Sequence, residues 1–327
     1  MGPDSQCAPQ SVPPIPLAPG RAIRKMSGLC MNWMAATLAS AVLLGCYDLA
    51  TRHAVRANAV LPVLFLSTLC GATVWIVLLA IQSAVAPCFP AALIVPYLTP
   101  SQHGLIMLKS LIVGSSWICT YFAIKHLPVS ISSPVRATGP VWTVAGALVV
   151  LAERPTWLQD LGMLMTIASF LLLSVAGRAE GVHFHRNKWV GWMLAGTMLG
   201  SVSSLYDRFL LGRAGFSPAT VQAWFLIYLA VFFLPVAAGW KFRWWARNEF
   251  QWRWSIPMIA GFLLVSDFLY FGALREPGAL ISIVASLRRG NTLVAFAGGI
   301  LLFGEKSSGT KILAVLGIVT GMVLTML

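Results

Sequence analysis

Two similar stretches, one in each half of the chain, decide the fold. Residues 133–154 read SPVRATGPVWTVAGALVVLAER, and residues 285–306 read ASLRRGNTLVAFAGGILLFGEK. An ungapped alignment pairs Arg136 with Arg288 and Glu153 with Glu305, and it also pairs the Ala-Gly dipeptides between them. The arginine therefore precedes the glutamate by the same number of residues in both stretches. This self-similarity indicates an internal repeat.

The repeat extends upstream in the same order, with small gaps. Tyr47-Asp48 recurs as Tyr206-Asp207, and the Tyr-Phe pair that begins at Tyr121 recurs at Tyr270, each time ahead of a proline. One such match would be weak evidence. Several matches in one order predict that a single unit has been duplicated to make most of the chain.

Composition identifies the environment of the chain. Of 327 residues, 58% are hydrophobic and 10% are charged, whereas soluble domains carry about 25% charged residues. Apolar runs of roughly 20 residues recur, each long enough to cross the hydrocarbon core as a helix. The sequence therefore predicts an all-α integral membrane protein with ten transmembrane helices, at residues 32–51, 60–82, 104–124, 128–152, 157–177, 189–210, 218–240, 255–274, 278–303 and 310–327.

The expected organisation is a tail followed by two repeats. Residues 1–30 are Pro-rich and basic and predict a disordered tail. Residues 31–180 and 181–327 each hold five predicted helices. Because five is odd, the second repeat enters the membrane from the opposite side, which predicts an inverted repeat. Transporters built this way bind substrate near the bilayer midplane, where the halves meet.

These motifs resemble the EamA domain of the drug/metabolite transporter superfamily. The similarity lies in the small-residue helices that end at Glu153-Arg154 and Glu305-Lys306, and it covers both repeats. It implies a ten-helix transporter of the bacterial inner membrane with both termini cytoplasmic. The resemblance also implies a central cavity, lined mainly by the helices expected at 32–51, 104–124, 128–152, 189–210, 255–274 and 278–303. The chain departs from the family at Asn291-Thr292, where the first copy has Gly139-Pro140, and in its double arginine.

The distribution of basic residues disagrees with this orientation. If the N-terminus is cytoplasmic, eight Lys/Arg residues lie on its side and twelve on the other. The positive-inside rule then favours the reverse orientation. We follow the family expectation. The Trp-rich, basic segment at residues 241–254 is typical of a segment lying at the lipid headgroups.

Arginines inside the predicted helices are candidate binding residues. Arg136 lies about 12 Å along its helix from Pro128, and Arg288 lies about 15 Å along from Gly278. Both are thus expected near mid-bilayer, where lining a cavity or forming a buried ion pair is favoured over snorkelling. Arg289 points about 100° away from Arg288 and is expected either to pair with a neighbouring helix or to contact substrate.

Aspartates in the spans are a second group of candidates. Asp267 is near the middle of its helix with no basic residue within one turn, so it is expected to couple proton movement or to pair with one of the arginines. Asp48 precedes Arg52 by four residues, which is the spacing of an ordinary intrahelical ion pair. Its recurrence as Asp207 indicates a shared task, either binding or structural.

Uncharged candidates complete the predicted site. Trp117, Tyr121, Trp142 and Tyr270 are expected either to line the cavity or to contribute to packing, and Asn291 lies beside the second arginine pair. Glu153 and Glu305 are expected to cap the next helix or to anchor a loop.

The sequence favours a secondary transporter that moves a small anionic or zwitterionic metabolite by proton coupling or exchange, because Arg suits carboxylate and phosphate. Drug or cation efflux is an alternative, and so is a channel, scramblase or sensor. An enzyme is disfavoured because no GxSxG or HExxH motif occurs. No cofactor, metal or nucleic acid is expected, since the basic residues are scattered; membrane lipid is the expected counterpart of the net charge of +13.

Overall fold

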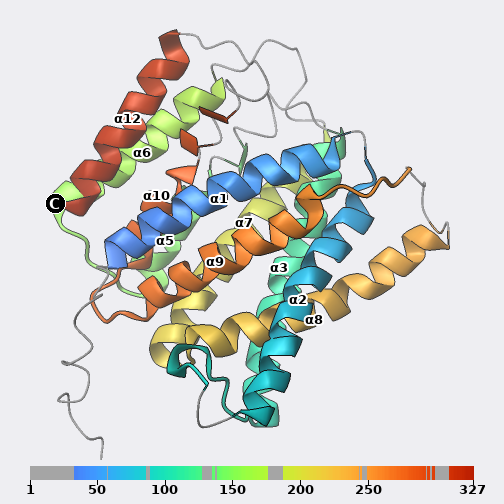
Figure 1. Ribbon diagram of the computed structural model, residues 1–327. Coiled ribbons are helices and arrows are strands. Elements are labelled where there is room, and N and C mark those ends of the chain that lie inside the picture. The colour runs from blue at the N-terminus through green and yellow to red at the C-terminus, as the bar shows by residue number, and fades with distance from the viewer. Residues whose placement is uncertain are drawn as a thin grey trace, which may run out of the picture. The chain divides into compact units, whose positions relative to one another are not determined.

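A computed structural model describes residues 33–56, 58–85, 89–126, 135–136, 138–175, 187–242, 244, 249–291, 293–294, 297–298 and 309–327. Residues Asn32–Leu327 form one compact unit (Figure 1). The predicted tail at 1–30 lies outside the described residues, as do Glu305 and Lys306.

The described part of the chain is helical. Its α-helices are α1 (Trp33–Val55), α2 (Val60–Ala84), α3 (Pro100–His126), α5 (Gly139–Val150), α6 (Trp157–Val175), α7 (Lys188–Arg208), α8 (Pro218–Lys241), α9 (Ser255–Arg275), α10 (Ile281–Arg288) and α12 (Gly309–Met326). A short 3-10 helix, η3 (Ala91–Leu93), precedes α3, and a π-helical turn, η4 (Phe209–Arg213), continues α7.

Five of these described helices, α1, α2, α3, α8 and α9, are long and apolar enough to cross a membrane. Two shorter apolar segments are α5 and residues Ile312–Met326 of α12. Exposed tryptophans Trp244, Trp252 and Trp254 lie between α8 and α9, as an interfacial segment requires. Residues 243 and 245–248 of that predicted segment are outside the described part.

Helices from the two halves pack against each other in pairs. α1 packs along α9, where Ser40 hydrogen-bonds with Ser266 and Asn58 Nδ2 donates to the Gln251 carbonyl (2.8 Å). Residue numbers rise along α1 as they fall along α9, so the two helices are antiparallel (Figure 1).

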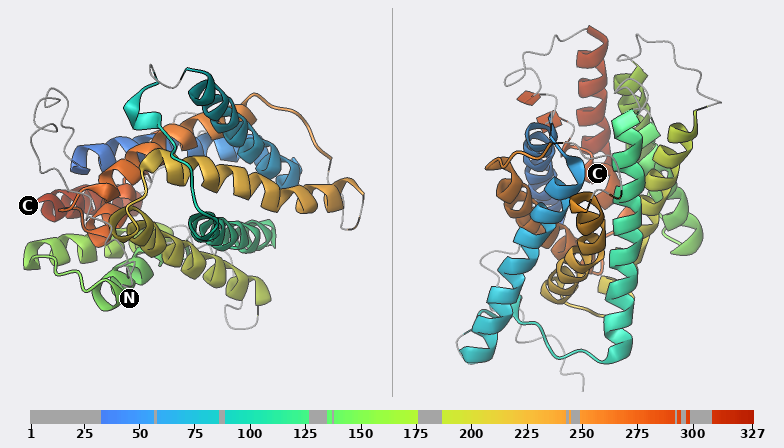
Figure 2. Two further views of the ribbon diagram at one scale, coloured as in Figure 1. Left: turned by 90° about the horizontal axis from the view of Figure 1, so that it is seen from below. Right: turned by 90° about the vertical axis from the view of Figure 1, so that its right-hand side faces the viewer.

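The α3–α7 pair has the same geometry. Tyr206 Oη donates to the Leu105 carbonyl (3.1 Å), and Ser116 Oγ donates to the Gly196 carbonyl (2.7 Å). These contacts make α3 and α7 antiparallel and adjacent (Figure 2). The two remaining large interfaces are α2 with α8 and α6 with α12.

The largest hydrophobic core lies where α2, α3, α8, α9 and α10 meet. Its fully buried side chains include Phe233, Phe271, Leu229 and Ile281. This apolar centre fixes the positions of the helices around the candidate site.

The predicted continuous helix at 128–152 is wrong in one respect. Residues 135–136 are helical, Thr138 is in a turn, and α5 begins at Gly139. Pro140 has no N–H to donate to the Arg136 carbonyl, so the helix cannot continue normally through this point. Residues 127–134 and 137 are outside the described part.

The predicted helix at 278–303 is also interrupted, directly after its arginine. α10 ends at Arg288, and the Gly290 N–H bonds the Leu287 carbonyl (3.0 Å), three residues back instead of four. Gly290 is a poor helix former. Residues 293–294 and 297–298 are helical again. Both predicted helices are therefore interrupted just after the aligned arginine.

Candidate functional site

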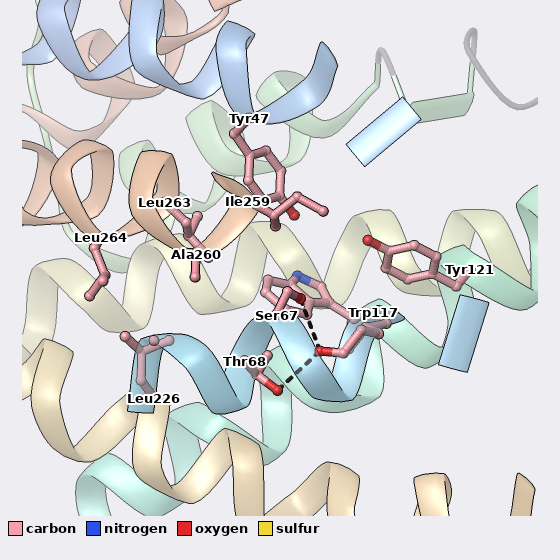
Figure 3. A pocket seen from close by; sticks show the side chains of 12 residues that line it. Tyr47, Ser67, Thr68, Trp117, Tyr121, Leu226, Ile259, Ala260, Leu263 and Leu264 are labelled. Atoms are coloured by element: carbon pink, nitrogen blue, oxygen red, sulfur yellow. Dashed lines mark hydrogen bonds between the residues drawn. The ribbon is translucent and has the colours of Figure 1, made fainter. Parts of the chain in front are cut away.

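A small, partly open cavity of about 10 Å³ lies between α1, α2, α3, α8 and α9 (Figure 3). Aliphatic and small residues from α2, α8 and α9 form most of its wall. The lining residues are Tyr47, Leu64, Ser67, Thr68, Gly71, Trp117, Tyr121, Leu226, Ile259, Ala260, Leu263 and Leu264.

Four hydroxyl groups supply the polarity of this cavity. Ser67 and Thr68 donate to the Leu64 carbonyl in their own helix (both 3.0 Å), so each keeps its acceptor lone pairs. The hydroxyls of Tyr47 and Tyr121, from α1 and α3, point towards the same part of the cavity (Figure 3). None of the described lining residues is charged.

The lining differs from the family expectation. The cavity takes its wall from α2 and α8 as well as α1, α3 and α9, and α5, α7 and α10 do not line it. Charged groups on α7 and α10 are occupied instead by partners within the protein: Asp207 by Lys109, and Arg288 by Asp267.

Two side chains of α9 contact Arg288. Its Nη2 forms an ion pair with Asp267 Oδ1, and its guanidinium lies over the Tyr270 ring, 4.0 Å from the centroid. Asp267 and Tyr270 are three residues apart and so share one face of α9. The Arg288 Nε is buried with no hydrogen-bond partner in the described structure. Asp267 therefore pairs with one of the two arginines expected for it.

Arg289 lies at the start of the first half's short helix. Its Nη2 is 2.9 Å from the point that a Cβ on Gly139 would occupy, so the glycine leaves room for the guanidinium. Electrostatic interactions link Arg289 to Arg136, Arg288 and Asp48. Arg289, the arginine without a counterpart in the repeat, thus lies within electrostatic range of both aligned arginines.

Arg136 is the most exposed of the three arginines. Among the described residues, no hydrogen bond or ion pair reaches its guanidinium. It interacts electrostatically with Tyr47 and Tyr121, which line the cavity. The group that includes Arg136, Arg288, Arg289, Asp48 and Asp267 is called the arginine cluster below.

Asp48 joins α1 to the segment after α10. The Asn291 Nδ2 donates to Asp48 Oδ2 (2.7 Å), while Asn291 Oδ1 is buried without a partner in the described structure. The expected Asp48–Arg52 pair is not testable, because the Arg52 side chain is outside the described part. Asp48 contacts the second half through Asn291.

Asp207 and Lys109 form a second, more deeply buried ion pair between α7 and α3. Lys109 Nζ contacts Asp207 Oδ1, and their side chains are 3% and 6% exposed. The Lys109 ammonium also lies over the rings of Phe225 and Phe271, at 4.6 and 5.0 Å from the centroids. The repeat gives Asp48 and Asp207 the same position, yet the two carboxylates have different partners.

Glu153 caps a helix in the other half of the chain. Its carboxylate accepts from the Ile281 N–H (2.7 Å), the Ser282 N–H (3.1 Å) and the Ser282 hydroxyl (2.6 Å). Of the two expected roles, capping the next helix or anchoring a loop, the structure shows the second: Glu153 caps α10 and so anchors the loop after α5 to that helix. The first half thereby holds the helix that carries Arg288.

The predicted aromatic residues divide into three environments. Trp117 and Tyr121 line the cavity, and Tyr270 lies under Arg288. Trp142 is exposed and donates to Thr138 Oγ1 (3.2 Å), away from the cavity. Sequence reasoning missed Tyr47, Ser67 and Thr68 as lining residues; of these, only Tyr47 had a signal, its recurrence as Tyr206.

Comparison with known proteins supports the membrane assignment. A family model described as the EamA-like transporter family matches residues 31–175. No curated protein matches the chain. A solved structure titled only "Crystal structure of protein" has a TM-score of 0.68 at 18% identity, over 90% of this chain and 98% of the other. That similarity shows a shared fold. Residues 31–175 thus match the EamA-like transporter family, and the chain is a multi-pass integral membrane protein.

Proposed function

We propose that this protein is a secondary transporter that moves a small anionic or zwitterionic metabolite by alternating access. The observations that carry the proposal are the cavity between helices of both halves and the cluster of three arginines inside the helix bundle. Interrupted helices beside a midplane site are a recurring feature of transporters. The helices of this chain are interrupted in the same way, after Arg136 and after Arg288.

The pairing of helices supports an inverted repeat. If α1, α2, α3, α5 and α6 correspond to α7, α8, α9, α10 and α12, then the α1–α9 interface corresponds to the α7–α3 interface, and both are antiparallel pairs. Likewise α1–α10 corresponds to α7–α5. The α2–α8, α5–α10 and α6–α12 interfaces each join a helix to its own counterpart. A two-fold relation between halves produces this set of pairs.

Two aligned glycines support the same relation. Gly146 faces Leu205 on α7, and Gly298 faces Leu49 on α1. Each glycine thus lets the interrupted helix of one half approach the first helix of the other half closely, as small residues do in membrane interfaces. The five long apolar helices, together with α5, α6, α7, α10 and α12, supply the ten spans of the proposal.

The charges of the arginine cluster favour an anion or zwitterion as the substrate. Three arginines and two aspartates leave one positive charge (3 − 2 = 1) among the five described members of the cluster. An uncompensated charge at membrane depth is costly, so an arriving anion is stabilised there. Proton coupling through Asp267 or exchange of one anion for another would drive the cycle.

Efflux of cationic or apolar drugs is the second candidate. The specific observation that favours it is the cavity wall, in which the described lining residues are uncharged and largely apolar. For either substrate class, the proposed setting is the bacterial inner membrane with both termini cytoplasmic. The proposed partners are the solute, surrounding lipid and a coupling proton.

The test is uptake by proteoliposomes that contain the purified protein. Labelled monocarboxylates, amino acids, phosphate esters and organic cations are offered under a proton gradient or with unlabelled solute inside. The proposal expects saturable uptake of an anion or zwitterion that one of these conditions stimulates. Arg288→Gln is expected to slow this uptake, whereas Arg275→Gln, at an exposed position on α9, is the matched control.

Three results would contradict the proposal. Absence of flux for every solute would contradict the proposal that the protein is a transporter. Flux that neither saturates nor responds to either driving condition would indicate a channel. Uptake restricted to organic cations would contradict an anionic or zwitterionic substrate and favour drug efflux, the second candidate.

A further inference from the structure

The Lys109–Asp207 ion pair contains the most deeply buried charged side chains of the described residues. These side chains are 3% and 6% exposed, and the pair joins α3 of the first half to α7 of the second. The rings of Phe225 and Phe271 cover the ammonium. Phe225 is tied to α3 in turn, because its carbonyl accepts from the Ser110 hydroxyl (3.1 Å). Helices of both halves therefore enclose the pair.

Stability alone does not account for a charged pair at this position. A buried ion pair is often no more stabilising than two apolar side chains of similar volume. Ionisable groups enclosed within membrane spans instead mark ion or proton pathways. Lys109 and Asp207 lie where the two halves meet, and alternating access moves one half against the other. When α3 and α7 separate, the carboxylate meets water.

The two ion pairs of the described helices differ in how they can accept a proton. Arginine does not lose its proton in proteins, so a proton on Asp267 would leave Arg288 as a permanent cation with one ring, Tyr270, beside it. A buried lysine is able to release its proton, unlike arginine. While charged, Lys109 keeps the faces of two rings after its carboxylate is neutralised. Asp207 is therefore the carboxylate better suited to bind and release a proton.

The other titratable groups that face Asp207 come from α9 and α10, and they are Asp267, Tyr270 and Arg288. α5 contains no titratable residue, and Arg213 of η4 is exposed. α9 contacts both ion pairs, because the adjacent rings of Tyr270 and Phe271, 5.4 Å apart, lie against Arg288 and Lys109. A proton on Asp207 thus adds positive charge next to the arginine cluster, where an anion is favoured.

We propose that the Asp207 carboxylate, in place of Asp267, binds the proton that drives transport. The proton comes from water on one side of the membrane, replaces the ion pair with Lys109, and leaves to water on the other side. The O–H bond that forms on entry breaks on exit. The inference rests on the proposed transport function and specifies its coupling ion. One proton that enters with one monoanion moves no net charge, so the transport is expected to be electroneutral.

Proteoliposomes separate proton coupling from solute movement. Counterflow, in which unlabelled solute inside exchanges for labelled solute outside, needs no net proton movement, whereas accumulation against a gradient does. The probes are labelled monocarboxylates and amino acids, offered under an inward proton gradient with the membrane potential clamped at zero. Wild type is expected to accumulate a monoanion about tenfold for each pH unit of gradient.

Lys109→Met/Asp207→Leu replaces the ion pair with apolar side chains of similar volume. This double variant is expected to lose accumulation while it still exchanges solute. Glu249→Gln removes an exposed carboxylate between α8 and α9 and is the matched control, which should retain both activities. Lys109→Gln/Asp207→Asn, a neutral pair that can still hydrogen-bond, keeps the test decisive if the apolar variant does not fold.

Infrared spectroscopy of the purified protein detects the proton itself. As the pH is lowered, wild type is expected to gain the carbonyl band of a protonated carboxyl group that Lys109→Gln/Asp207→Asn lacks. Identical bands in the two proteins would overturn the inference. So would accumulation that persists in either double variant, loss of counterflow together with accumulation, or wild-type flux that does not respond to the proton gradient. In that last case transport itself stands, whereas absence of wild-type flux contradicts the proposed function.

Discussion

At the scale of single residues, the ion pair between Asp267 and Arg288 neutralises one arginine of the cluster. Both side chains are largely buried, at 14% and 19% exposed. Removing one partner leaves the other charge uncompensated, which costs more than the pair itself contributes.

Asp267→Asn is expected to lower the free energy of unfolding by about 1–3 kcal/mol, less than for a fully buried pair because some exposure remains. Unfolding in a detergent titration measures the change. The double variant Asp267→Asn/Arg288→Gln should recover part of the loss. A double variant less stable than both single variants would show that the pair does not have this role.

The Lys109–Asp207 pair is more buried, and its lysine is enclosed by two phenylalanine rings. Lys109→Met is expected to cost about 3–5 kcal/mol because it leaves the Asp207 carboxylate unpaired in an apolar setting. Adding Asp207→Leu should restore most of this stability, since an apolar pair of similar volume is often neutral. The same titration checks it, and full stability of Lys109→Met alone would contradict the prediction.

Single-residue roles were only partly predictable from sequence. The repeat identified Arg136 and Arg288 as counterparts, and the lone in-span carboxylate Asp267 indicated a cationic partner. The pairing of Lys109 with Asp207 was missed, although both are isolated charges in separate spans. Which isolated charges meet depends on helix rotation and depth, and the sequence of a single helix determines neither.

At the scale of elements, Glu153 connects the halves by capping α10. Glu153→Gln weakens a charge-assisted cap, typically by about 0.5–2 kcal/mol. Hydrogen exchange at the amides of Ile281 and Ser282 is expected to become about tenfold faster, corresponding to about 1.4 kcal/mol of local stability.

Asp160→Asn is the matched control for that measurement, because Asp160 lies in the first turn of α6. It should leave exchange in α10 unchanged. Equal exchange in Glu153→Gln and wild type would show that the carboxylate does not hold α10.

The long apolar helices were predicted closely. The expected 60–82 is observed as Val60–Ala84, and 255–274 as Ser255–Arg275. Their apolar composition determines them with little help from context. The interruptions after Arg136 and Arg288 were not predicted, because the surrounding apolar runs continue through Pro140 and Gly290. Backbone hydrogen bonds lost at those points are compensated only in the packed protein.

At the scale of the whole molecule, an inverted repeat places equivalent loops on opposite sides of the membrane. Tyr97, before α3, and Trp252, before α9, are both exposed and lie in corresponding connections. In a cysteine-free background, Tyr97→Cys and Trp252→Cys are expected to react with a membrane-impermeant maleimide from opposite faces. Labelling of both from the same face would contradict the inverted arrangement.

The position of the cavity could not be predicted from sequence. Its wall draws one to four residues from each of five helices, and most are ordinary apolar side chains. Two of its four hydroxyl residues, Ser67 and Thr68, resemble many other hydroxyl residues in spans. Only the assembled helices reveal that they surround one space.

The central claim, that this cavity is the path of the solute, is tested most directly by filling it. Gly71 lines the cavity, where a Cβ would lie 3.3 Å from Leu226, whereas Gly261 on α9 has open space around it. Solute uptake by proteoliposomes compares Gly71→Leu with the matched substitution Gly261→Leu. The account predicts that Gly71→Leu abolishes saturable uptake while Gly261→Leu retains it. Equal uptake by the two variants would contradict the claim.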